Sequence, residues 1–167
     1  VFYAFINNKK AIVLAPTTIL SQQLYTCFND RLEAFGCNIA QVSRLTKSNK
    51  EKFKDFLLGK TDVLIGTHSI IKNQDVLKKA SLLVVDEEHR FGVKDKEKII
   101  KVSPRCNFLS MSATPIPRTL QFALSGIRNI STLLTAPVER RPIITNIHVF
   151  SFKTILNYMF EELNRNG

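Results

Sequence analysis

The sequence predicts an α/β protein in which a doubly wound parallel sheet is flanked by helices. Short apolar runs of strand length recur, and each is nearly continuous in hydrophobicity, as in strands buried on both faces of a parallel sheet. Segments with helical spacing lie between them, and this alternation is typical of a layered α/β fold. The predicted strands are residues 11–15, 39–42, 62–65, 82–86, 108–111 and 130–134.

Two of the intervening segments, residues 17–35 and 48–58, predict helices in more detail. The second begins with Ser48 and has Glu51 three residues later, which is a capping-box pattern. Gly59 is expected to end that helix, because glycine readily adopts the left-handed conformation of a helix C-cap. The expected apolar positions are Leu20, Leu24, Cys27, Phe28 and Leu32 in the first helix and Phe53, Phe56 and Leu57 in the second.

The composition changes near Ala136, where prolines and arginines interrupt the pattern in a way typical of a connector. An extended run, residues 143–150, and a helix, residues 151–163, are expected to follow, and these elements are too few for a domain. We therefore predict one lobe over residues 1–136, and a connector with the beginning of a second lobe over residues 137–167. Val1 and Gly167 resemble cut ends, as expected for a piece of a longer protein. The interrupting residues are Pro137, Arg140, Arg141 and Pro142.

The charge balance favours a polyanionic partner. Lys and Arg number 24 against 14 Asp and Glu, a formal net charge of +10, and so strong a basic excess favours nucleic acid over a merely solvated surface. The three cysteines show no C-x-x-C spacing, which fits a reducing, cytoplasmic setting. No apolar run reaches the roughly 18 residues of a membrane span, so no membrane partner is expected.

Four ionisable residues, Asp86-Glu87-Glu88-His89, directly follow the predicted strand 82–86. They cannot continue a buried strand, so they are expected at its carboxyl end, where parallel sheets bind ligands. An aspartate there can hold Mg²⁺, directly or through water, beside the phosphates of a nucleotide, and a neighbouring glutamate can activate water. The alternative is an acidic helix N-terminus stabilised by the helix dipole. The full pattern favours phosphate chemistry.

Small hydroxyl residues and cations follow the other predicted strands. Ser112 and Thr114 come after strand 108–111 and are placed to bridge to the acidic run, with Pro117 in the first turn of the following helix. Hydroxyls and free N–H groups at helix starts are suitable donors to phosphodiester oxygens, although each could instead be an ordinary helix cap. The expected backbone-binding residues are Thr17, Thr18, Gln22, Arg44, Gly66, Thr67 and His68.

The order APTTILSQQ, GTHS, DEEHRFGV, SATPIPRTL resembles motifs Ia, Ib, II and III of superfamily 2 helicases. The forms DEEHRFGV and ATPIPRTL resemble the RecG-like branch, which contains the fork-reversing RecG enzymes and the bacterial transcription-repair coupling factors. RecG enzymes usually read DEQH, whereas this chain reads DEEH. The stretches Ser43-Arg44-Leu45 and 125–131 also resemble the coupling factors more closely. The resemblance covers nearly the whole chain.

This resemblance implies a RecA-like lobe of an ATP-dependent translocase on double-stranded DNA, with ATP and Mg²⁺ as cofactors. Asp86 would hold Mg²⁺ through water, Glu87 would activate the attacking water, and His89 would link this loop to Ser112, Thr114 and Arg118. The coupling factors push on stalled RNA polymerase and recruit an excision-repair protein in the bacterial cytoplasm. These partners are therefore expectations for the complete protein.

The family's P-loop, G-x-x-x-x-G-K-[ST], is expected about twenty residues before strand 11–15, and the sequence does not contain it. Gly59-Lys60-Thr61 matches its last three positions, but it lies between a helix and a strand rather than between a strand and a helix. We therefore expect the 167 residues alone to be inactive as an ATPase. Two alternatives are a RecG-type fork-remodelling helicase and a non-catalytic, basic nucleic-acid-binding module.

Overall fold

The chain forms two compact units, Val1–Arg128 and Asn129–Gly167. The computed structural model describes residues 1–44, 48–113, 129–135 and 145–165. Within these residues, no helix combines the length and the apolar character that crossing a membrane requires.

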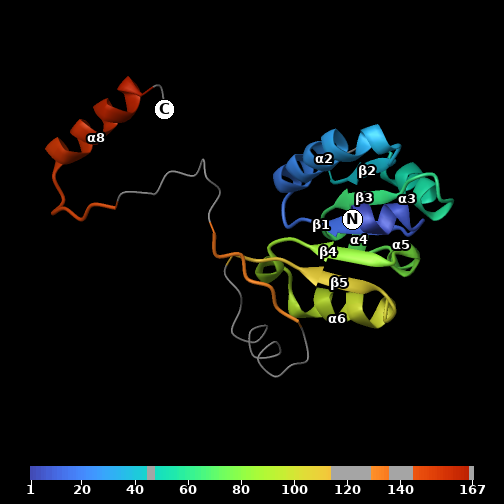
Figure 1. Ribbon diagram of the computed structural model, residues 1–167. Coiled ribbons are helices and arrows are strands. Elements are labelled where there is room, and N and C mark those ends of the chain that lie inside the picture. The colour runs from blue at the N-terminus through green and yellow to red at the C-terminus, as the bar shows by residue number, and fades with distance from the viewer. Residues whose placement is uncertain (45–47, 114–128, 136–144, 166–167) are drawn as a thin grey trace. The chain divides into compact units, whose positions relative to one another are not determined.

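The first unit is built on a five-stranded sheet in which every pair of neighbouring strands is parallel (Figure 1). The strand order is β2-β3-β1-β4-β5, so β2 and β3 lie on one side of β1 and β4 and β5 on the other, as in a doubly wound fold. This confirms the predicted sheet and five of the predicted strands, within one residue at each end. The strands are β1 (Ala11–Leu14), β2 (Ile39–Val42), β3 (Val63–Gly66), β4 (Leu82–Val85) and β5 (Asn107–Ser110).

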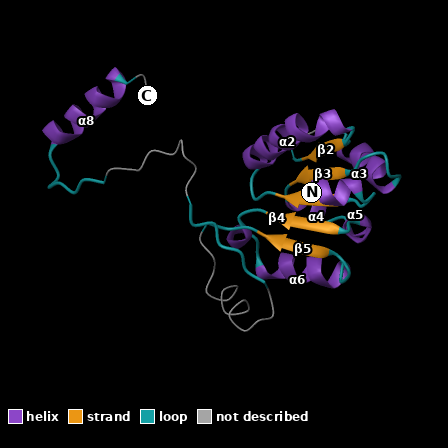
Figure 2. Ribbon diagram, viewed as in Figure 1, coloured by secondary structure: helices purple, strands orange, loops and turns teal. Residues whose placement is uncertain are grey.

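Helices cover both faces of this sheet (Figure 2). Successive side chains of a strand point to opposite faces, and along β1 Ile12 and Leu14 join one apolar cluster while Ala11 and Val13 join the other. The first cluster packs under α3 (Asn49–Leu57), α4 (His68–Ile71), α5 (Gln74–Lys79) and α6 (Val93–Val102). The second packs under α1 (Phe2–Ile6) and α2 (Thr18–Leu32), which continues into the 3-10 turn η1 (Glu33–Phe35).

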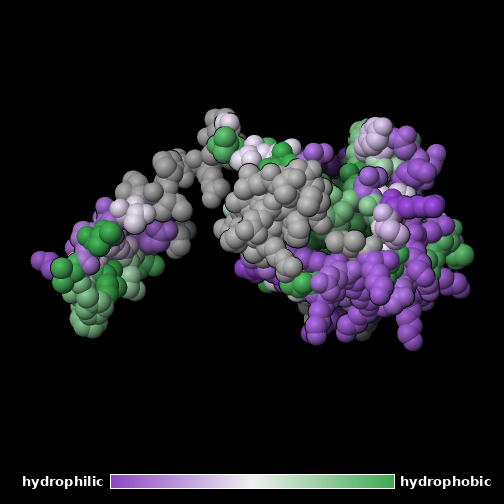
Figure 3. All heavy atoms as spheres, turned by 90° about the horizontal axis from the view of Figure 1, so that it is seen from below, coloured by the Kyte–Doolittle hydropathy of each residue, from purple (hydrophilic) through white to green (hydrophobic). Residues whose placement is uncertain are grey.

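The surface over α6 is strongly hydrophilic (Figure 3). Ile99 of this helix is buried in the core, whereas Lys94, Glu97 and Lys101 are exposed. An apolar stripe on one side and charged residues on the other are typical of a helix that covers a sheet.

The strand register brings the ends of all five strands to one level. Leu14 of β1 pairs with Gly66 and with Val85, Val42 pairs with Gly66, and Val85 pairs with Ser110. We call this level the carboxyl edge of the sheet and the opposite one the amino edge. Every predicted functional residue that directly follows a strand therefore lies at the carboxyl edge.

Gly66, at the end of β3, is required by close packing. A Cβ added here would collide with the backbone oxygen of Val42 and come within 2.8 Å of Ile70 Cδ1. The absence of a side chain is what lets β2 and the start of α4 approach the end of β3.

Three details predicted for the helices are wrong. Ser48 does precede α3, but it has a φ of 70° and its side chain makes no cap hydrogen bond, because a capping residue needs extended backbone to aim its oxygen at the helix. Cys27 lies on the exposed side of α2, and Ser21 is buried instead. Of the apolar positions expected in α3, Phe56 is buried whereas Leu57 is exposed.

Gly59 ends α3 as predicted. It has a φ of 88°, its N–H donates to Phe56 O (3.2 Å), and the next N–H, of Lys60, donates to Asp55 O (2.9 Å). This is a Schellman C-cap. Gly59-Lys60-Thr61 is thus a helix end at the amino edge, which is incompatible with a strand-to-helix phosphate loop.

In the second unit, the helix predicted over residues 151–163 is confirmed as α8 (Phe152–Asn164), with Ser151 at its N-cap. The strand predicted over residues 130–134 is wrong, because residues 129–135 have no regular structure. Leu133 and Leu134 are almost fully exposed there, so no burial supports an extended ladder. Residues 145–150 of the expected extended run also form no strand. The predicted connector residues 137–142 lie outside the described part of the chain.

Candidate functional site

Asp86 is the first residue after β4. Its N–H donates to Leu14 O (2.9 Å), which extends the ladder with β1 by one bond. Its carboxylate Oδ1 accepts the Glu87 N–H at 2.9 Å. The backbone is therefore fixed by the sheet, while the half-buried carboxylate lies at the carboxyl edge.

Glu87 has an unusual backbone and an unusual carboxylate. Its φ of 49° and ψ of 52° are left-handed, a conformation that costs a non-glycine residue about 1–2 kcal/mol. Its Oε2 is buried and has no hydrogen-bond partner among the described residues, although His89 Nδ1 lies 3.3 Å away. This short separation is an ion pair only when the imidazole is protonated. A buried acceptor without a donor is costly, so this oxygen is suited to receive a proton or to bind water.

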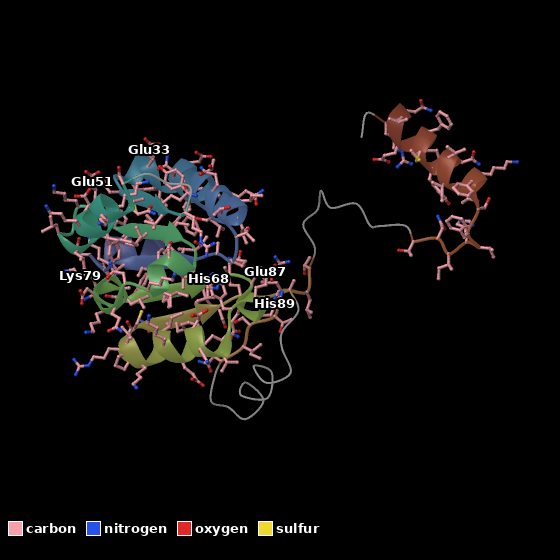
Figure 4. The ribbon with its side chains drawn as sticks, turned by 180° about the vertical axis from the view of Figure 1, so that it is seen from behind. Glu33, Glu51, His68, Lys79, Glu87 and His89 are labelled. Atoms are coloured by element: carbon pink, nitrogen blue, oxygen red, sulfur yellow. The ribbon has the colours of Figure 1, made fainter. Side chains whose placement is uncertain are left out.

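His89 connects the end of β4 to the end of β5. Its Nδ1 and Ser112 Oγ are hydrogen-bonded at 3.1 Å. The Glu88 N–H also donates to Met111 O (3.1 Å), so backbone and side chain join the same two loops. Glu87 and His89 lie together at one end of the sheet, whereas Lys79 lies at the opposite end (Figure 4). Thr114 and Arg118, which were expected to complete this link, lie outside the described residues.

Glu88 differs from its neighbours because it is buried and paired. Only 6% of it is exposed, and its Oε1 lies 2.9 Å from Lys96 Nζ in the first turn of α6. Sequence reasoning did not single out Lys96. The signal available was a lysine near a helix start, where the helix dipole disfavours a cation unless it has a partner.

The end of β3 carries Thr67, which is buried, and His68, which begins α4. The His68 ring stacks on Phe91 with centroids 4.6 Å apart and planes 23° apart. Its Nε2 lies 3.6 Å from Asp95 Oδ2 of α6. Neither Phe91 nor Asp95 was predicted, because contacts between different strand ends leave no local pattern in a sequence.

The ends of β1 and β2 contribute the remaining candidates. Thr17 is the N-cap of α2, where its Oγ1 accepts the Leu20 N–H at 3.2 Å, so part of its role is the ordinary capping considered above. Thr18 begins that helix, and Arg44 is exposed after β2. Gln22 is exposed one turn further along α2, where it lines an open groove of that helix.

The described residues fit a metal ion only if a nucleotide shares in holding it. No group of three or more His, Cys, Asp or Glu side chains is placed to hold a metal within this part of the chain. Mg²⁺ at nucleotide sites commonly uses one or two carboxylates together with waters and phosphate oxygens. Asp86 offers such a carboxylate at the carboxyl edge.

Comparison with known proteins identifies the family. Residues 2–123 match the model of the DEAD/DEAH box helicase family. The chain belongs to this helicase family. The fold is accordingly RecA-like.

Its relatives are repair proteins and helicases. The chain is 42% identical over 167 residues to a transcription-repair-coupling factor of Helicobacter pylori (strain ATCC 700392 / 26695), covering 100% of this chain and 16% of that protein. It is 40% identical over 168 residues to that of Borreliella burgdorferi, covering 99% and 15% respectively. It also resembles the structure of RecG bound to a three-way DNA junction, with a TM-score of 0.71 and 26% identity over 95% of this chain and 22% of that one. The chain thus spans about a sixth of the length of these coupling factors.

Proposed function

We propose that this chain is a segment of an ATP-dependent double-stranded DNA translocase, below called the complete translocase. Residues 1–136 form the first RecA-like lobe, and residues 137–167 form a connector and the beginning of the second. The compact units divide earlier, after Arg128. The observation that carries the proposal is the His89–Ser112 hydrogen bond, which joins the acidic end of β4 to a neighbouring strand end.

Glu87 is the general base of ATP hydrolysis in this proposal. Its Oε2 has no hydrogen-bond partner among the described residues, and a carboxylate near a bound nucleotide can take a proton from the attacking water. Asp86 holds Mg²⁺ through water, and the ion neutralises charge on the phosphates when ATP is bound. We propose that the family's P-loop is supplied by chain outside these 167 residues, so that they hydrolyse no ATP alone.

His89 relays the state of this loop to the end of β5. The support is its hydrogen bond to Ser112 together with its 3.3 Å separation from Glu87 Oε2. One imidazole nitrogen lies within reach of both oxygens, so a change at Glu87 can alter the bond to Ser112. Thr114 and Arg118 belong to the same motif and extend the relay.

The other strand ends track the backbone of DNA. Hydroxyls, helix-start N–H groups and a cation at one edge are donors suited to phosphate oxygens, and such contacts are largely independent of base sequence. The basic net charge of +10 supports a polyanionic partner, and binding is expected to weaken steeply with salt. The proposed contacts are Thr17, Thr18, Gln22, Arg44, Gly66, Thr67 and His68.

In the bacterial cytoplasm, the complete translocase displaces stalled RNA polymerase and recruits an excision-repair protein. This role is supported by the identity of about 40% to transcription-repair-coupling factors over the whole chain. Translocation along duplex DNA supplies the force in this proposal.

The test is Glu87→Gln in the complete translocase. Loss of the general base is expected to lower DNA-stimulated ATP hydrolysis by about 10²–10⁴-fold while ATP binding is retained. Glu51→Gln is the matched control, because Glu51 is an exposed glutamate of α3 away from this edge. Turnover at the wild-type rate in the Glu87 variant would refute the assignment. Lack of ATPase activity in the wild type would favour a non-catalytic binding module.

A RecG-type fork-remodelling helicase is the second candidate, favoured by the likeness to DNA-bound RecG. The two functions are separated by supplying the complete translocase with a model replication fork and with a stalled transcription complex. Release of polymerase without fork regression supports the coupling role, and the reverse result supports fork remodelling.

A further inference from the structure

The first turn of α6 touches two strand ends through neighbouring side chains. Lys96 Nζ lies 2.9 Å from Glu88 Oε1, beside the proposed general base after β4. Asp95 Oδ2 lies 3.6 Å from His68 Nε2, after β3. One short helical turn therefore contacts both the proposed ATP site and the proposed DNA track.

The Glu88–Lys96 pair is placed to fix the geometry of motif II. Both side chains are largely removed from water, at 8% and 19% exposed respectively, and a charge left unpaired there is costly. Glu88 directly follows Glu87, whose left-handed backbone depends on its surroundings. Movement of α6 would thus be transmitted to the Glu87 carboxylate through a stiff contact.

Phe91 provides a second, apolar contact between the same two strand ends. Its N–H donates to Glu88 O (3.1 Å), and its buried ring stacks on His68. His68 is thus held between Phe91 and Asp95, which lie on either side of the Gly92 turn. Displacement of His68 by a bound phosphate must move one or both of them.

We propose that Lys96 and Phe91 are positioning residues through which DNA at His68 and nucleotide at Glu87 alter each other's affinity. This coupling adds a route separate from the His89–Ser112 bond, and it rests on the function proposed above. Energetic coupling between two sites is reciprocal. Its strength can therefore be measured as the change in DNA affinity that a nucleotide causes.

The experiment measures the Kd of the complete translocase for a duplex DNA fragment, with and without a non-hydrolysable ATP analogue. The wild-type ratio of the two Kd values is expected to be about 5–150. Lys96→Met and Phe91→Leu are each expected to lower this ratio by about two-fold or more, while the route through His89 and Ser112 remains. Lys96→Arg, which keeps the charge, is expected to retain the wild-type ratio.

Lys79→Met is the matched control, since Lys79 is an exposed lysine in the last turn of α5, at the opposite end of the sheet. It should leave the ratio unchanged. Thermal melting identifies any variant that fails to fold, and the second variant then carries the test. A wild-type ratio in either folded variant, Lys96→Met or Phe91→Leu, overturns the inference. A wild-type protein with no nucleotide-dependent DNA affinity and no DNA-stimulated ATPase contradicts the proposed function instead.

Discussion

The two edges of the sheet use aspartate in opposite ways. At the amino edge, Asp62 accepts from Lys10 Nζ at 2.8 Å and from the Asn38 N–H at 2.9 Å. Lys10 Nζ also donates to Gly59 O at 2.7 Å. At the carboxyl edge, the hydrogen bond found for the Asp86 carboxylate is with the adjacent Glu87 N–H. The first carboxylate joins distant segments of the fold, whereas the second leaves most of its hydrogen-bonding capacity for other groups.

This difference separates an aspartate that holds the fold together, Asp62, from one whose carboxylate is available to bind other groups, Asp86. Carboxylates that bind several protein donors contribute to stability, and moving such a group disturbs the fold. A carboxylate held by its backbone alone, beside the buried and unpartnered Oε2 of Glu87, contributes little to folding. Such a group is available to water, to a cation or to a ligand.

The largest expected effect is a separation of activity from stability between the two aspartates. Asp86→Asn in the complete translocase should lower ATP hydrolysis by about 10³-fold or more, because the proposed ligand of Mg²⁺ loses its charge. Asp62→Asn should leave turnover per folded molecule near wild type and destabilise the lobe by about 1–3 kcal/mol. Steady-state ATPase rates and hydrogen exchange of the β1 and β3 amides provide the two measurements. Similar losses of activity in both variants would contradict the comparison.

The next largest effect concerns a glycine at each edge. Gly66→Ala is expected to cost about 2–4 kcal/mol of stability, because the new methyl meets the backbone of Val42, which cannot turn away. Gly59→Ala meets no atom within 4 Å, so its expected cost is the strain of a left-handed alanine, about 1–2 kcal/mol. Denaturant unfolding gives the free energy of unfolding of each variant, and so shows which of the two substitutions costs more stability. A larger loss for Gly59→Ala would show that the end of β3 can relax.

Local sequence patterns predicted much of this arrangement. Continuous apolar runs gave five strands, and the acidic residues after one of them had to leave a buried strand, which places Asp86 and Glu87 at the carboxyl edge. The motif order also predicted a link between His89 and Ser112, and the structure shows these side chains hydrogen-bonded. Their roles in catalysis and coupling stay proposals.

Other features depend on contacts that no local pattern encodes. The Glu88–Lys96 pair and the His68–Phe91 stack join different loops, and their spacing in the sequence resembles that of solvated charges and ordinary core residues. The strand expected at residues 130–134 failed for a related reason. An apolar run favours a strand only when a neighbouring strand or layer covers it, and Leu133 and Leu134 are exposed.

A smaller effect is expected at the junction of β4 and β5. His89→Ala and Ser112→Ala should each lower DNA-stimulated hydrolysis about ten-fold, because both remove the same hydrogen bond. The double variant should be little worse than either single variant, since residues that act through one contact are not additive. The ATPase rates of the two single variants, the double variant and the wild type form a double-mutant cycle that measures this. If the fold-loss of activity in the double variant equalled the product of the two single losses, His89 and Ser112 would act independently.

The smallest expected effect is at Cys37, next to the amino edge. Burial, and secondarily the charge of Asp62, raises the pKa of this thiol to about 11 from 9.0, with Lys10 acting in the opposite direction. The thiolate is the reactive form, so at pH 8 a thiol reagent should modify the exposed Cys27 well before Cys37. Because burial is the largest cause, Asp62→Asn should speed modification of folded Cys37 by less than about ten-fold. Peptide mass mapping over time measures both rates, and a larger acceleration would mean that Asp62, rather than burial, controls this thiol.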